Sequence, residues 1–115
     1  IGVAVSDSPT GPFKDIGTPL VKGTLTEPQS SNWNDIDPTV WVETVDGVEH
    51  RYLAWGNGIF YVCELNDDMI SVKDLDNDGS ITMGKDVLQQ EFTGLQDGLG
   101  FTEAPWIYRQ QDADG

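Results

Sequence analysis

The stretch NDIDPTVWVETVDGVEHRYLAWGNGIFYVCEL, residues 34–65, decides the fold. It contains three runs rich in β-branched and aromatic residues, at 38–45, 50–55 and 59–65. Asp46-Gly47 and Asn57-Gly58 separate these runs. Both dipeptides are strong hairpin signals, because type I′ turns need positive φ at both central residues. The stretch therefore predicts an antiparallel meander of three strands.

The flanking sequence extends this meander into a larger all-β pattern. Part of Val87–Phe92 is expected to add a fourth strand, and Trp106–Tyr108 to begin another unit. No window sustains apolar residues at helical spacing. Four antiparallel strands followed by a new one are typical of a β-propeller blade. A piece of a β-sandwich, which uses similar short strands, is the alternative.

The chain divides, on this interpretation, into four parts of a partial propeller domain. We expect the end of one blade, a polar connector, one blade with an Asp-rich loop, and the start of the next blade. These parts are residues 1–16, 17–34, 35–100 and 101–115.

Composition limits the classes of ligand. The 115 residues include six basic and twenty acidic side chains, giving a net charge of −14. Such a surface repels phosphate backbones and anionic lipids, so nucleic acid and membrane are not expected partners. A neutral sugar polymer or a cation suits this charge. Cys63 is the only cysteine, which excludes an internal disulfide.

Two acids, Asp37 and Glu103, each lead into a short apolar run next to a proline. They lie 103 − 37 = 66 residues apart, at equivalent places in the two successive units. The first strand of a propeller blade lines the central channel, so both acids are expected to face one cavity. Two carboxyl groups around one pocket can cleave a glycosidic bond. The competing interpretation is that each acid only caps a turn.

Four segments of the sequence together resemble glycoside hydrolase family 43. They are IDPTVW at 36–41, YLAWGN at 52–57, FYVCELNDDMIS at 60–71 and TEAPWIYR at 102–109. The resemblance runs from AVSDSPTGPF, at 4–13, to the last of these segments. It implies a fragment of a five-bladed β-propeller, with about one full blade and parts of its two neighbours. Members of the family remove arabinose or xylose units from plant cell-wall polysaccharides.

The resemblance also implies roles for the two acids in an inverting mechanism. Glu103 matches the general acid, and Asp37 matches the aspartate that modulates the pKa of that acid and orients it. The family's general base is a third aspartate, placed upstream of Ile1, with no counterpart here. We therefore expect the chain alone to be inactive and the whole enzyme to be secreted or periplasmic. No cofactor is required for this chemistry.

A second cluster of acids resembles a calcium-binding loop. DLDNDGSI, residues 74–81, places Asp74, Asp76 and Asp78 like the first half of an EF-hand loop. Lys85 stands where the loop's twelfth residue, a bidentate acid, is expected. A calcium ion here would hold the loop and take no part in catalysis. A solvated Asp- and Gly-rich hairpin loop is the competing interpretation.

Trp33 is the candidate for substrate binding, because it lies in the polar connector just before Asp37. Its ring offers a flat apolar face to a sugar, although packing in the core or between blades is the usual role of a tryptophan. Two other functions remain open: a non-catalytic carbohydrate-binding propeller and a calcium-dependent structural module. Loss of the upstream aspartate would favour the first, and calcium-dependent stability without sugar binding would favour the second.

Overall fold

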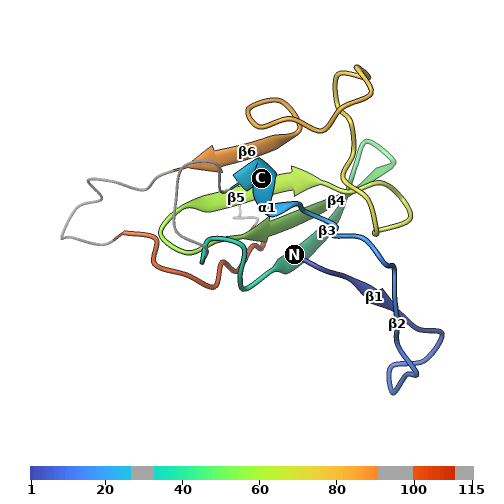
Figure 1. Ribbon diagram of the computed structural model, residues 1–115. Coiled ribbons are helices and arrows are strands. Elements are labelled where there is room, and N and C mark those ends of the chain that lie inside the picture. The colour runs from blue at the N-terminus through green and yellow to red at the C-terminus, as the bar shows by residue number, and fades with distance from the viewer. Residues whose placement is uncertain (27–32, 91–99, 111–115) are drawn as a thin grey trace.

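The computed structural model describes residues 1–26, 33–90 and 100–110, which form two antiparallel sheets (Figure 1). The larger sheet has the strand order β3-β4-β5-β6, and the smaller one pairs β1 with β2. Their bounds are β1 Ala4–Val5, β2 Lys14–Asp15, β3 Thr39–Val45, β4 Val48–Trp55, β5 Phe60–Glu64 and β6 Val87–Gln90. The four-stranded meander and the all-β class are as predicted.

Among the residues that the structure describes, helical structure is limited to α1, the single turn Gly23–Thr26. Within the described ranges, no helix has the length and apolar character needed to cross a membrane.

The two predicted hairpins form, but their turns differ. Val45 pairs with Val48, so Asp46 and Gly47 alone make the first turn, with φ of 51° and 82° as a type I′ turn requires. In the second hairpin the last pair is Trp55 with Tyr61, and the loop is longer than two residues. There positive φ falls on Gly56 and Gly58, so the prediction of a type I′ Asn-Gly turn was wrong.

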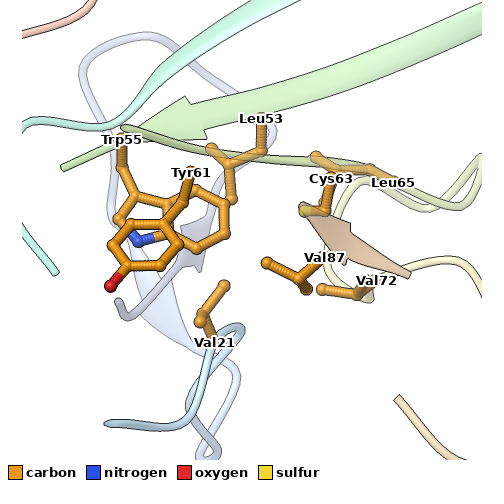
Figure 2. Close-up of a cluster of buried hydrophobic side chains, with 8 residues drawn as sticks. All are labelled: Val21, Leu53, Trp55, Tyr61, Cys63, Leu65, Val72 and Val87. Carbon is orange, nitrogen blue, oxygen red and sulfur yellow. The ribbon is translucent and has the colours of Figure 1, made fainter. Parts of the chain in front are cut away.

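The hydrophobic core covers one face of the larger sheet (Figure 2). The rings of Trp55 and Tyr61 stack in this cluster, with centroids 5.4 Å apart and planes at 17°. Burial raises the pKa of the Cys63 thiol in this core to about 12, which leaves it unreactive at neutral pH. The cluster is made of Val21, Leu53, Trp55, Tyr61, Cys63, Leu65, Val72 and Val87.

The opposite face of the sheet carries the C-terminal segment. Trp41 and Tyr52 are paired across β3 and β4 on this face, and residues 107–109 line a shallow hollow with them. Arg109 Nη1 lies 3.5 Å from Glu43 Oε2. Residues 106–108 form no strand, which corrects the prediction. Ile107 and Tyr108 line the hollow on the sheet's face, and no described strand pairs with residues 106–108.

Candidate active site

The loop between β4 and β5 holds the two segments that carry Asp37 and Glu103. The Gly56 N–H donates to the Ile36 carbonyl at 3.1 Å, and the Gly58 N–H donates to the Thr102 carbonyl at 2.6 Å. Each acid directly follows the residue whose carbonyl is bound. Asn57 and Glu103 also form an antiparallel bridge. Two segments distant in the sequence therefore meet at one loop, at the left end of the sheet in Figure 1.

Both segments have unusual backbone conformations next to their prolines. Asp37, directly before Pro38, has φ of 54°, and Ala104, directly before Pro105, has φ of 55°. Left-handed φ costs a residue with a Cβ roughly 1–2 kcal/mol, and a following proline restricts the backbone further. Such strain is concentrated at functional sites. Asp46, Met69 and Asn77 have similar φ but do not precede a proline, so among the described residues Asp37 and Ala104 share a combination of their own.

The two acids and two nearby tryptophans are open to solvent. Asp37 and Glu103 are both exposed, so a ligand can reach either carboxyl group. Trp33 is 67% exposed and Trp106 is 82% exposed. Each tryptophan lies within four residues of one acid in the sequence. Trp33 thus has the exposure that sugar binding needs, and Trp106 is a second ring of the same kind.

Asp35 also belongs to this region and was missed by the sequence analysis. Its Oδ1 accepts a hydrogen bond from Trp55 Nε1 at 2.8 Å, and its Oδ2 accepts one from Thr26 Oγ1 at 2.7 Å. Both donors are side chains 20 and 9 residues away. Spacing along the chain gives no sign of such pairs, so only the fold reveals them.

The Asp-rich loop follows β5 and therefore lies at the other end of that strand from Gly56–Gly58. Carboxylate oxygens of Asp74, Asp76 and Asp78 all lie within 4.8 Å of one another. Lys85 Nζ lies 2.5 Å from Asp76 Oδ2 and 2.9 Å from Asp78 Oδ2. These contacts raise the pKa of Lys85 above its usual range, and the hydrogen bond from Lys85 lowers the pKa of Asp76. The ammonium thus supplies positive charge where a calcium ion would.

Asp86 closes this loop from within. It is 1% exposed and accepts hydrogen bonds from the backbone N–H groups of Thr82 at 2.8 Å and Leu75 at 2.7 Å. Those two bonds hold the pKa of its carboxyl below the usual range. Asp86 therefore joins the two ends of the loop, a role that the sequence does not indicate.

Calcium binding should depend on residue 85. Lys85→Glu restores the bidentate acid of the EF-hand pattern and removes the competing ammonium. Calcium at about 5 mM exceeds the dissociation constants of weak calcium sites. We expect this concentration to raise the Tm of the variant by several degrees. The wild-type protein should respond less. Differential scanning fluorimetry with and without calcium measures both.

Two controls make the calcium result specific. Lys85→Gln removes the ammonium without adding a carboxylate, and magnesium tests whether any divalent cation suffices. A Lys85→Glu protein whose Tm ignores calcium would show that the three aspartates do not form a ligand set.

The family model described as Glycosyl hydrolases family 43 matches residues 1–113. Among curated proteins, no match to the chain was found.

Proposed function

Because the chain belongs to glycosyl hydrolase family 43, we propose that its residues form part of an inverting glycosidase for arabinofuranosyl or xylosyl linkages. Membership of this β-propeller family implies glycoside hydrolysis of plant polysaccharides in general. The four-stranded meander β3-β4-β5-β6 has the topology of one blade. Since cell-wall polymers stay outside cells, the proposal includes a secreted or periplasmic enzyme.

One observation supports the site most strongly: the bonds of Gly56 and Gly58 that hold the two acid-bearing segments together. In the proposed reaction Glu103 gives its proton to the glycosidic oxygen as the bond to the leaving group breaks. Asp37 modulates and orients this acid. A carboxylate beside a carboxylic acid favours the acid's protonated form, because two negative charges repel each other. Exposure of both groups leaves room for a sugar.

We propose that the general base of this mechanism is not one of these 115 residues. An inverting glycosidase needs a second carboxylate across the sugar ring, about 6.5–9.5 Å from the acid, to activate the attacking water. The aspartate that fills this role in the family has no counterpart in the sequence of 115 residues. We therefore propose that the 115-residue chain alone is inactive and that the full-length protein hydrolyses the substrate.

The substrate proposal predicts both activity and stereochemistry. The full-length protein should hydrolyse an aryl α-arabinofuranoside or an aryl β-xyloside, and an aryl glucoside should serve as the poor substrate. Proton NMR of the first turnovers should show a sugar of inverted anomeric configuration. Retained configuration, or no hydrolysis of either pentoside, would contradict the proposal.

Sugar binding without hydrolysis is the second candidate, favoured by the exposed rings of Trp33 and Trp106. Aromatic rings stack on the apolar faces of sugars whether or not a bond is cleaved. Titration of arabino- or xylo-oligosaccharides into the full-length protein, followed by tryptophan fluorescence, separates the two. Saturable binding with no released sugar would favour the binding protein.

A further inference from the structure

Asp35 is a carboxylate held from two sides by the core. Trp55 Nε1 and Thr26 Oγ1 donate to its two oxygens, at 2.8 Å and 2.7 Å. Trp55 is fully buried and Thr26 is 5% exposed, so neither donor is free to move. Both carboxylate oxygens are thus engaged by fixed groups of β4 and α1.

Further hydrogen bonds fasten the same short segment. Asn34 Nδ2 donates to the Tyr61 hydroxyl at 3.4 Å, and that hydroxyl donates to the Thr26 carbonyl at 3.2 Å. Tyr61 also stacks on Trp55. Residues 34 and 35 are therefore bound to the end of α1 and to the neighbouring strands β4 and β5.

These contacts lead directly to Asp37. Asp35 binds the Trp55 side chain, and the next residue, Ile36, accepts a backbone hydrogen bond from Gly56, the residue after Trp55. The end of β4 and the first residue of its loop therefore hold both Asp35 and Ile36. Asp37 follows with its left-handed φ of 54°. A strained conformation of this kind persists only where the surroundings determine it.

We propose that Asp35 is a positioning residue for Asp37. It touches no substrate, and it holds the backbone that fixes Asp37 relative to Glu103. This inference rests on the proposed function and deepens it, since it assigns a role to a third acid at the same site. Loss of the Asp35 hydrogen bonds should let Asp37 relax and displace its carboxyl group from Glu103.

The test uses the full-length enzyme with Asp35→Ala. Misplacement of a group by about 1 Å can cost on the order of 100-fold in rate, so we expect kcat to fall about 10- to 100-fold with little change in KM. We also expect the alkaline limb of the pH–rate profile to move to lower pH, because Asp37 no longer supports the protonated acid. Reduced stability alone would lower the Tm and the active fraction and leave that limb in place.

Two further variants keep the test decisive if Asp35→Ala folds poorly. Thr26→Val removes one donor with almost no change in shape, and should move the limb in the same direction by a smaller amount. Asp35→Asn keeps an oxygen for Trp55 Nε1 and an amide that can donate to Thr26 Oγ1, so it should rescue most of kcat.

The outcomes are distinguishable. An active wild type whose kcat and alkaline limb are unchanged by Asp35→Ala and by Thr26→Val would overturn this inference alone. A wild type with no glycosidase activity would overturn the proposed function and this inference with it.

Discussion

Glu103→Gln is expected to reduce hydrolysis of a natural glycosidic linkage by about 10²- to 10⁴-fold, the usual contribution of a general acid. Glu103 is exposed, and its backbone forms the bridge with Asn57. Glutamine has nearly the same size, but it has no acidic proton to give. Binding should change little, so the loss should appear in kcat with KM nearly constant. Steady-state kinetics of the full-length enzyme on an arabino- or xylo-oligosaccharide measure this.

The leaving group identifies the step that Glu103 assists. A dinitrophenolate departs without protonation, so the variant should hydrolyse a dinitrophenyl glycoside far better, relative to wild type, than it hydrolyses an oligosaccharide. Glutamine also carries no titrating group, so the alkaline limb of the pH–rate profile should disappear. Equal losses on the two substrates would point to a binding role for Glu103.

Glu49→Gln is a matched control for this substitution. Glu49 is exposed near the start of β4 and forms an ion pair with Arg51, whereas the Gly56–Gly58 loop follows the other end of that strand. The same chemical change there should leave kcat and KM as in wild type. A loss of activity in both variants would indicate a general effect of charge on this acidic protein.

The parts of the fold that are determined by residues adjacent in the sequence were the most predictable. Asp46-Gly47 determines a turn by its own backbone preferences, and the structure forms it as predicted. Residues 106–108 have strand-like composition but no strand partner within the described part of the chain, and they form no strand. Composition favours an extended conformation, whereas a strand also requires a neighbour to bond to.

The site shows the same division between local and distant information. Asp37 and Glu103 stand out through their prolines and through the resemblance of their segments to a family. The loop that brings the segments together could not be predicted. Gly56 binds a residue 56 − 36 = 20 positions upstream, and Gly58 binds one 102 − 58 = 44 positions downstream. The supports of Asp35 are equally distant from it, and no turn preference or periodicity encodes them.

Gly56→Ala is expected to be the most damaging substitution in the loop. A Cβ at this position would lie 1.8 Å from the Ile59 carbonyl oxygen and 3.3 Å from Phe101 Cε1. The residue also has φ of 141°, a conformation that is strained for alanine. Strain of roughly 1–3 kcal/mol adds to overpacking of about the same size. We expect the free energy of unfolding to fall by about 3 kcal/mol or more.

Gly47→Ala separates the effect of a close Cβ contact from the effect of backbone strain at positive φ. Gly47 has φ of 82° in the Asp46-Gly47 turn, and a Cβ there would meet nothing within 4 Å. Alanine at this position should therefore cost only the roughly 1–2 kcal/mol of a left-handed conformation. Urea unfolding of the two variants, followed by tryptophan fluorescence, gives the difference. Equal losses would mean that the loop adapts to a side chain at Gly56.

We expect Gly56→Ala to reduce catalytic activity as well as stability. Relief of the clash must move Gly56 away from Ile59, and the Gly56 N–H that binds Ile36 moves with it. The segment with Asp37 should then shift relative to the segment with Glu103, so kcat should fall even at a temperature where the variant is fully folded. Gly47→Ala should leave kcat unchanged. A folded Gly56→Ala enzyme with wild-type kcat would show that this loop does not set the relation between the two acids.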